Sequence, residues 1–187
     1  MIAIFAKSLK EQGKLKVNTA VVTVMTNIGF KQFAKENGIN VAETRVGDRY
    51  VLEEMLKNDY VIGGEQSGHI IFKDFATTGD GQLTGLQFAS IIAKTGKTAS
   101  ELASVMQVFP QTMVNVSATP ELKSLLKTDA DIKNAINSVA EKLGDEGRIL
   151  VRASGTEPLI RVMLEGKNIK EIAAMAEDVA AVIKSKA

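Results

Sequence analysis

The sequence predicts an α/β domain with a mixed sheet over residues 1–107, followed by a small α+β domain over residues 112–187. In the first range, short β-branched segments alternate with helical patterns, which is typical of helices layered on a sheet. In the second range the order is strand, helix, strand, strand, helix, which favours an antiparallel sheet with helices on one face. Phe109-Pro110 separates the ranges, and we expect a hinge over residues 108–111 because proline fixes one dihedral angle.

Elements of the first range are marked by apolar spacing and by residues that start or stop helices. Apolar residues recur at helical spacing from Ile2 to Leu9, and Gly13 follows as a stop. Asp48 is placed to cap a later helix, because a short acidic side chain accepts hydrogen bonds from the first free N–H groups. The other expected elements are strands over 19–25, 39–44, 61–62 and 70–72, a helix over 28–36, a helix from Asp80 to about Gly96, and a helix after the capping-box match Thr98–Glu101.

The second range opens with an expected strand over Met113–Val116, which Pro120 breaks. Apolar residues then recur at helical spacing from Ile132 to Leu143. The remaining elements are strands over 148–153 and 159–165, joined by a tight polar loop, and a helix over 169–183 that Asn168 caps with Glu171 as capping partner.

Composition excludes several classes of protein. The 187 residues are 45% hydrophobic and 24% charged with a net charge of +1, a globular mixture that disfavours nucleic-acid and membrane partners. The absence of Cys and the presence of one His exclude disulfides, thiolate sites and multi-histidine metal sites. No apolar run approaches the roughly 18 residues that span a bilayer, and Met1–Ala6 lacks the preceding positive charge of a signal peptide. We therefore expect a cytoplasmic protein.

The segment Arg152–Pro158 carries the strongest binding pattern. A phosphate dianion binds several donors at once, namely backbone N–H groups, hydroxyls and guanidinium groups. Gly155 would let the backbone approach a ligand and adopt unusual dihedral angles, so the loop would form an anion nest between two strand ends. A plain hairpin turn with two solvated arginines is the alternative. The candidate phosphate-binding residues are Arg152, Ser154, Gly155, Thr156 and Arg161.

The segment Gly63–His69 is the second candidate for binding. Its glycines allow a ligand to approach, and Glu65, Ser67 and His69 would project together if the segment is extended. A carboxylate beside a hydroxyl suits sugar hydroxyls, which both donate and accept hydrogen bonds. A flexible turn with a solvated histidine is the alternative, since a lone histidine is more often incidental than catalytic.

Two further segments carry charged residues that could either bind a ligand or serve the start of a helix. Arg49 follows Asp48 in the first turn of a helix, where it opposes the helix dipole, and anion binding would explain its placement. Thr77–Gly81 is similar to a fragment of a metal loop, but one carboxylate holds Mg²⁺ poorly and Asp80 serves as a cap. The residues therefore predict no metal site in this chain.

Four motifs together resemble the α-D-phosphohexomutase superfamily, in the same order and along essentially the whole chain. They are Val46–Tyr50, Gly64–His69, Thr78–Gly81 and Arg152–Pro158. The form of the first two, with Pro110-Gln111 and Leu159–Met163, is most similar to the bacterial phosphoglucosamine mutases. This resemblance implies that residues 1–107 are domain three, and residues 112–187 domain four, of a four-domain fold of the phosphohexomutase type.

The resemblance also implies an activity. Members of this group are isomerases that interconvert glucosamine 6-phosphate and glucosamine 1-phosphate through a bisphosphate intermediate, in amino sugar metabolism and peptidoglycan precursor synthesis. A phosphoserine of the first domain donates the phosphoryl group, and Mg²⁺ is held by an Asp-Gly-Asp-x-Asp-Arg loop of the second. Neither the segment that carries the phosphoserine nor the metal loop occurs in this sequence. Phosphoryl transfer depends on a metal ion that stabilises the developing charge. We therefore expect this chain to be inactive as a mutase by itself.

By the same resemblance, Glu65 and Ser67 would contact sugar hydroxyls, Arg49 would be an active-site cation, and His69 would orient the sugar or transfer a proton. The five candidate phosphate-binding residues would hold the distal phosphate. Expected partners are glucosamine phosphate, its bisphosphate, the amino-terminal half of the same enzyme and, through an exposed apolar patch at the first helix, a second copy in a homodimer. The alternatives are a non-catalytic sugar-phosphate-binding module, an idle structural domain, and a phosphomannomutase or phosphoglucomutase relative.

Overall fold

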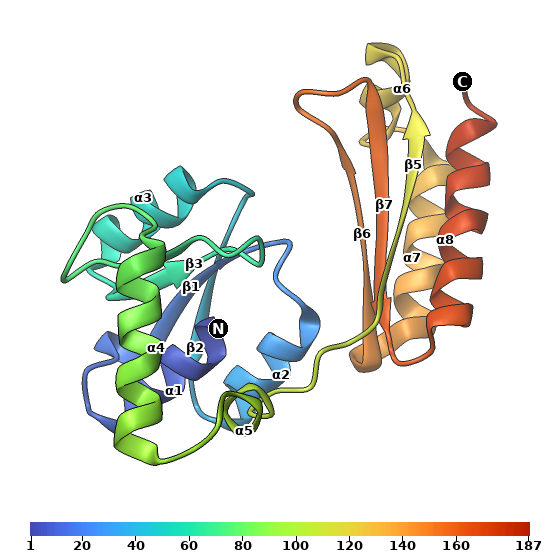
Figure 1. Cartoon of the computed structure of the whole chain (residues 1–187). Coiled ribbons are helices and arrows are strands. Elements are labelled where there is room, and N and C mark those ends of the chain that lie inside the picture. Colours follow the sequence, from blue (N-terminus) through green and yellow to red (C-terminus); the bar gives the residue numbers. More distant parts are fainter. The chain divides into compact units, whose positions relative to one another are not determined.

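The computed structural model describes all 187 residues and divides them into two compact units, Met1–Val108 and Phe109–Ala187. Each unit has its own sheet and its own hydrophobic core (Figure 1). The two candidate loops therefore belong to different units, and each is built by the residues of one unit.

The sheet of the first unit has the strand order β2-β1-β3-β4. β1 pairs in parallel with both β2 and β3, and β4 pairs antiparallel with β3, which confirms the predicted mixed sheet. The carboxyl ends of the three parallel strands therefore lie at one edge. At this edge the connection after β1 runs through α2 and the connection after β2 runs through α3, on opposite faces of the sheet. Ligands usually bind at such an edge in open α/β sheets. The strands are β1 (Thr19–Thr23), β2 (Asn40–Thr44), β3 (Ile62–Gly64) and β4 (Ile70–Phe72).

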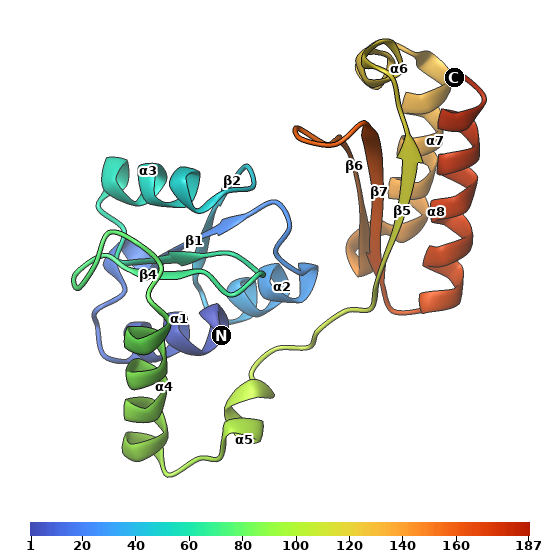
Figure 2. The same ribbon diagram turned by 45° about the horizontal axis from the view of Figure 1, so that its top comes forward.

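Helices cover both faces of this sheet. Successive residues of β1 face opposite sides, so Ala20 and Val22 join the core with α1 and α2, whereas Val21 packs in the cluster beneath α3. Figure 2 shows α3 on one face of the sheet and α1 and α2 on the other. The helices are α1 (Ile2–Glu11), α2 (Ile28–Glu36), α3 (Asp48–Asn58), α4 (Gly81–Thr95) and α5 (Ala99–Ala103), with a short 3₁₀ helix η1 (Lys16–Asn18) before β1.

Two of the helix starts have the predicted capping chemistry. The Asp80 carboxylate accepts a hydrogen bond from the Leu83 N–H at 2.9 Å at the start of α4. Thr98 and Glu101 form a complete capping box at the start of α5, because each side chain accepts from the backbone N–H of the other. These predictions are confirmed.

The prediction that Asp48 caps a helix is wrong. Asp48 is the first residue of α3, and its carboxylate accepts from the adjacent Arg49 N–H at 2.8 Å. The cap position belongs to Gly47, whose φ is 129°, a conformation open to glycine but strained for other residues. Asp48 instead contributes a negative charge to the first turn, where the helix dipole favours it.

The second unit is a three-stranded antiparallel sheet in the order β5-β7-β6, with α7 and α8 on one face as predicted (Figure 1). On the central strand β7, Ile160, Val162 and Leu164 face the helices, whereas Arg161 and Glu165 alternate onto the other face. The elements are β5 (Gln111–Ser117), α6 (Pro120–Leu125), α7 (Ala130–Leu143), η2 (Gly144–Glu146), β6 (Gly147–Ala153), β7 (Leu159–Gly166) and α8 (Ile169–Lys184).

Pro120 does more than end a strand. It is the first residue of the short helix α6, and Thr119 caps that helix by accepting from the Leu122 N–H at 3.3 Å. Proline is well suited to this position, because the N–H that it lacks has no partner in a helix anyway. α6 escaped prediction because its six residues are too few to show a periodic pattern.

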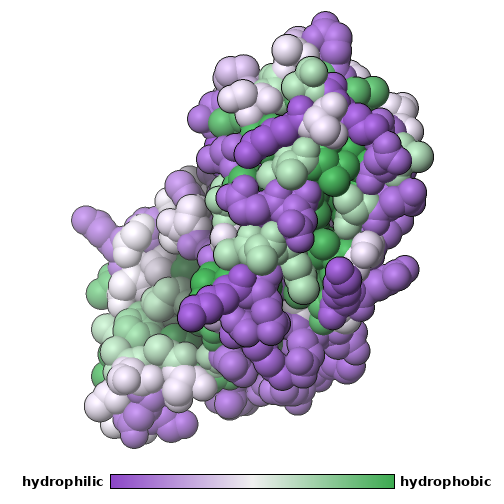
Figure 3. Space-filling view, turned by 90° about the vertical axis from the view of Figure 1, so that its right-hand side faces the viewer, coloured by the Kyte–Doolittle hydropathy of each residue, from purple (hydrophilic) through white to green (hydrophobic).

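On the face drawn in Figure 3, hydrophilic residues cover much of the surface and hydrophobic residues form smaller groups between them. No helix combines the length and the apolar character needed to cross a membrane.

Candidate functional site

The turn between β3 and β4 lies at the carboxyl edge of the parallel strands in the first unit. The Glu65 N–H donates to the His69 C=O at 2.8 Å, and the Gly68 N–H donates to the Glu65 C=O at 3.1 Å. Gly68 has a φ of 107°, which other residues rarely adopt. Residues 65–69 therefore form a tight turn. The segment is thus not extended, so the condition under which Glu65, Ser67 and His69 would project together is not met.

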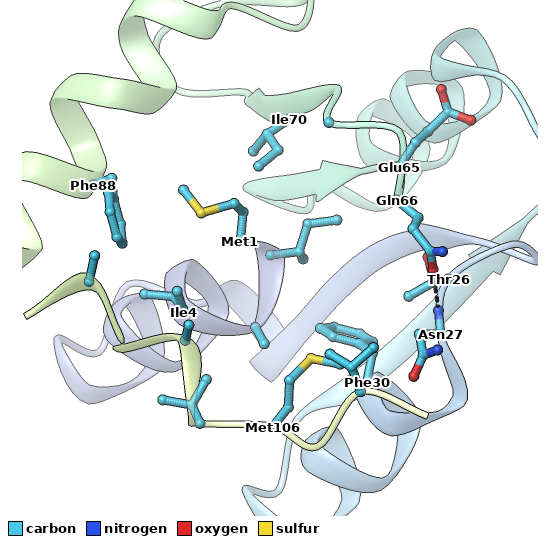
Figure 4. Close-up of a pocket in the computed structure, with 17 residues that line it drawn as sticks. Met1, Ile4, Thr26, Asn27, Phe30, Glu65, Gln66, Ile70, Phe88 and Met106 are labelled. Atoms are coloured by element: carbon cyan, nitrogen blue, oxygen red, sulfur yellow. Dashed lines mark hydrogen bonds between the residues drawn. The ribbon is translucent and has the colours of Figure 1, made fainter. Parts of the chain in front are cut away.

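Side chains of this turn connect the loops that follow the parallel strands. Glu65 Oε1 accepts from the Gly47 N–H at 3.0 Å, in the loop after β2. Gln66 Oε1 accepts from the Asn27 N–H at 2.8 Å, in the loop after β1 (Figure 4). The partners are 18 and 39 positions apart in the chain, so no local pattern marks them. Glu65 thus orders the site as well as offering it a carboxylate.

Ser67 and His69 are both exposed on this turn. The His69 ring lies against Gly79, where an added Cβ would come within 2.7 Å of His69 Cδ2. Glycine at position 79 therefore permits the close approach. The structure brings together two segments that the sequence analysis singled out separately, residues 65–69 and 77–81.

Arg49 extends from the first turn of α3, and 80% of its side chain is exposed. Its Nε donates to Glu53 Oε1 at 2.8 Å, and this hydrogen bond raises the pKa of Arg49. The Glu53 carboxylate offsets the unfavourable position of a cation near the positive end of the helix dipole. A local ion pair therefore accounts for Arg49, while the remaining guanidinium N–H groups can still donate to a ligand.

A pocket of about 600 Å³ opens beside Gln66 in the first unit. Apolar side chains such as Phe30 and Phe88 form most of its wall, and the polar groups of Asn27 and Gln66 lie at one side (Figure 4). Apolar walls leave sugar hydroxyls without hydrogen-bond partners. The polar side of the pocket therefore suits a sugar better than its interior.

The loop between β6 and β7 is the candidate anion site of the second unit. Arg152 and Arg161 are directly paired on these neighbouring strands, so both side chains lie on the sheet face away from α7 and α8. Burial and the nearby Arg161 guanidinium lower the pKa of Arg152. The structure thus brings two predicted cations together, and their mutual repulsion would be relieved by an anion.

Glu157 places a carboxylate beside this pair. It forms an ion pair with the Arg161 guanidinium, and its N–H donates to Ser154 Oγ at 3.2 Å. Ser154 is buried, so its hydroxyl serves the loop itself. The Arg161 Nε is also buried and has no hydrogen-bond partner. Glu157 was not among the predicted site residues, because an acidic side chain is not expected beside an anion.

Gly155 and Thr156 form the exposed tip of this loop. Gly155 is not among the glycines with positive φ, and an added Cβ would meet nothing within 4 Å. Gly155 therefore does not use the positive φ that glycine permits. The open space above Gly155 does leave the backbone accessible to a ligand.

Lys123 was also missed, and it reaches the same loop from α6. Its Nζ donates to the Ser154 C=O at 2.9 Å and to the Glu157 C=O at 2.7 Å. These partners follow Lys123 by 31 and 34 positions, which hides the relationship in the sequence.

The residues present do not form a metal centre. No group of three or more His, Asp or Glu side chains is placed to hold a metal ion. Asp80, the one carboxylate of the motif that is similar to a metal loop, is occupied at the start of α4.

Solved structures with similar folds include an Aspergillus fumigatus N-acetylphosphoglucosamine mutase in complex with GlcNAc-6P and magnesium. It matches 98% of this chain and 43% of its own with a TM-score of 0.78 at 21% identity. A phosphoglucomutase/phosphomannomutase family protein from Burkholderia thailandensis matches 98% of this chain and 40% of its own, with a TM-score of 0.77 at 19% identity.

Curated relatives are closer in sequence. The phosphoglucosamine mutase of Clostridium botulinum is 54% identical over 186 residues, which is 100% of this chain and 41% of that protein. The phosphoglucosamine mutase of Clostridium novyi is 55% identical over 188 residues, 100% of this chain and 42% of that protein. The chain therefore spans about two fifths of the length of these relatives.

Two family profiles account for nearly the whole chain. Domain III of phosphoglucomutase/phosphomannomutase, an alpha/beta/alpha domain, matches residues 1–109. The C-terminal domain of phosphoglucomutase/phosphomannomutase matches residues 113–182. The layered first unit and the antiparallel second unit are thus successive domains of one known architecture, and the chain belongs to the phosphoglucomutase/phosphomannomutase family.

Proposed function

We propose that this chain supplies the sugar-binding and phosphate-binding half of a phosphoglucosamine mutase, an isomerase that interconverts glucosamine 6-phosphate and glucosamine 1-phosphate through a bisphosphate. The observation that carries the proposal is the opposed pair Arg152 and Arg161 beside the exposed loop tip. The amino sugar as substrate is supported by identities of 54% and 55% to relatives of that name. A cytoplasmic location and a role in amino sugar metabolism and peptidoglycan precursor synthesis follow from the same proposal.

In the second unit, the loop grips the phosphate that does not react. The guanidinium groups of Arg152 and Arg161 and the N–H groups of the exposed residues Gly155 and Thr156 offer the several donors that a dianion requires. The Thr156 hydroxyl adds another donor. Ser154 acts indirectly in this scheme, since its Oγ accepts from the Glu157 N–H inside the loop.

In the first unit, the β3–β4 turn contacts the sugar. The Glu65 carboxylate, fixed by the Gly47 N–H, has further acceptor sites for hydroxyls, and the exposed Ser67 hydroxyl both donates and accepts. The exposed His69 ring, seated on Gly79, orients the sugar or moves a proton. Arg49 adds a cation at the neighbouring helix start.

The phosphoryl donor and Mg²⁺ belong to the remainder of the longer protein. When bound, Mg²⁺ stabilises the charge of the transferring phosphoryl group. No side-chain group in this chain suits it, as the occupied Asp80 illustrates. We therefore place the metal loop and the phosphoserine outside these 187 residues, and we expect no mutase turnover from this chain alone.

The hinge that we propose is shorter than the expected range of residues 108–111. Gln111 already pairs with Glu165 in the sheet, and the Pro110 C=O accepts from the Gly166 N–H at 3.2 Å. These bonds tie both residues to the second unit. We place the hinge at Val108 and Phe109, where one unit ends and the next begins.

Two measurements test the proposed function. Calorimetric titration of the chain with glucosamine 6-phosphate should show binding that Arg152→Ala weakens, and absence of binding by the unmodified chain would refute the binding role. Mixing the chain with the amino-terminal part of the Clostridium botulinum relative and Mg²⁺ should then produce glucosamine 1-phosphate. Binding without turnover in the mixture would favour a sugar-phosphate-binding module instead.

A further inference from the structure

The Lys123 ammonium is bound to the backbone of the β6–β7 loop and not to a carboxylate. Its Nζ donates to the Ser154 C=O at 2.9 Å and to the Glu157 C=O at 2.7 Å. The side chain is half-buried on α6, a helix whose first residue follows β5. The two carbonyls flank the exposed loop tip, so one cation fixes the backbone on both sides of Gly155 and Thr156.

The contact with Lys123 also fixes the direction of the Gly155 N–H, because of the geometry of the peptide bond. The Ser154 C=O and the Gly155 N–H belong to one peptide unit, and all peptide bonds of the chain are trans. In a trans peptide the C=O and the N–H point in opposite directions. When Lys123 holds the Ser154 C=O, the Gly155 N–H is therefore directed away from Lys123, at a position where nothing lies within 4 Å of an added Cβ.

The contact with Lys123 also engages two carbonyl oxygens that would otherwise repel an anion. Carbonyl oxygens carry partial negative charge and repel phosphate, whereas N–H groups attract it. Lys123 engages the carbonyls before and after the loop tip, so the tip can present donors. Arg152 and Arg161 supply the cations on the adjoining strands.

We propose that Lys123 is a positioning residue for the phosphate-binding loop: it orients the Gly155 peptide so that its N–H donates to the anion. This inference rests on the proposed function of that loop. It assigns Lys123 no contact with the phosphate, because its donors already bind two carbonyls.

The experiment uses the full chain with inorganic phosphate as the probe. Lys123→Met removes the charge and the donors, and Lys127→Met is the control, since Lys127 is exposed just beyond the same helix and carries the same charge. NMR follows the Gly155 and Thr156 amides without ligand and during the titration. We expect K123M to weaken phosphate binding about tenfold, the loss typical of one charged hydrogen bond, and to shift the Gly155 amide without ligand. K127M should change the affinity less than about twofold.

Two further variants keep the test decisive. Lys123→Arg retains charged donors and should restore binding to within about threefold of the unmodified chain, whereas Lys123→Gln should not, because it lacks the charge. This comparison replaces K123M if K123M does not fold. Unchanged affinity and an unchanged Gly155 amide in K123M, or in K123Q if K123M is unfolded, would overturn the role of Lys123. Failure of the unmodified chain to shift the Gly155 amide with phosphate would instead overturn the proposed function of the loop, and the role of Lys123 with it.

Discussion

Arg152 and Arg161 occupy directly opposed positions on the neighbouring antiparallel strands β6 and β7. Like charges at such positions destabilise a sheet. Burial, and to a smaller extent the Arg161 charge, lowers the pKa of Arg152. An anion bound beside both guanidinium groups would relieve this repulsion, as the proposed phosphate-binding role requires.

Replacing Arg152 with Ala should weaken binding of glucosamine 6-phosphate by about 1.5–3 kcal/mol, the value of a hydrogen bond to a charged group. Calorimetry of the full chain measures this change. Lys127→Ala, which removes an exposed charge just beyond α6, is the control. Equal affinities of R152A and the unmodified chain would show that the phosphate lies elsewhere.

Removing the Arg152 charge should weaken ligand binding but stabilise the folded second unit. Arg152→Met keeps much of the side-chain volume and removes the repulsion from Arg161, so the free energy of unfolding of the second unit should rise by about 0.5–1 kcal/mol. Urea unfolding followed by NMR signals of α8 measures it. A decrease would mean that packing of the Arg152 stem outweighs the repulsion.

Glu157 should compete with the ligand for Arg161. Glu157→Gln removes the carboxylate from its ion pair and should tighten phosphate binding by about two- to fivefold, since a half-exposed pair is worth less than about 1 kcal/mol. An NMR titration with inorganic phosphate gives the affinity. Weaker binding would show that Glu157 acts mainly by ordering the loop through Ser154.

The buried ion pair between Arg148 and Glu165 should matter for stability. Arg148 Nε donates to Glu165 Oε2 at 2.7 Å, and Glu165 is 0% exposed. Glu165→Gln removes the buried carboxylate that accepts from Arg148 and should cost about 3–5 kcal/mol of unfolding free energy. Lys167→Met, which breaks an exposed pair with Glu146 in the same unit, should cost less than about 1 kcal/mol. Similar costs in urea unfolding would contradict this distinction.

Gln66 should hold the loop after β1 in place. Gln66→Ala removes the acceptor of the Asn27 N–H and should cost about 0.5–1.5 kcal/mol. Hydrogen exchange of the Asn27 amide should accelerate, while exchange at Val139 in the second unit should not change. Unaltered protection at Asn27 would show that the bond to Gln66 is dispensable.

The sequence predicted those features that depend on near neighbours. Asp80 and the pair Thr98 and Glu101 lie within one turn of the N–H groups that they cap, so their spacing is sufficient. Alternation along β7 likewise separates the helix-facing side from the side that carries Arg161. The prediction that Asp48 caps a helix failed because glycine can also occupy the cap position, and Gly47 does so one residue earlier.

Contacts across long stretches of chain could not be predicted. Lys123 reaches carbonyls more than thirty positions away, and the bond from Gln66 to Asn27 spans 39. Both depend on the folded path of the backbone, and neither carbonyls nor N–H groups differ from one residue to the next. The candidate residues could thus be named from the sequence, but not the groups that fix them in place.

The alternation of apolar and charged side chains along β7 also specifies its register against β5 and β6. A shift of one position against β5 and β6 would turn Arg161 and Glu165 toward α7 and α8, and would remove Ile160 and Leu164 from the core. Placing two charged groups in the apolar core without their partners makes such misaligned states costly during folding. The charged side chains on the open face of β7 therefore also disfavour incorrect strand pairings.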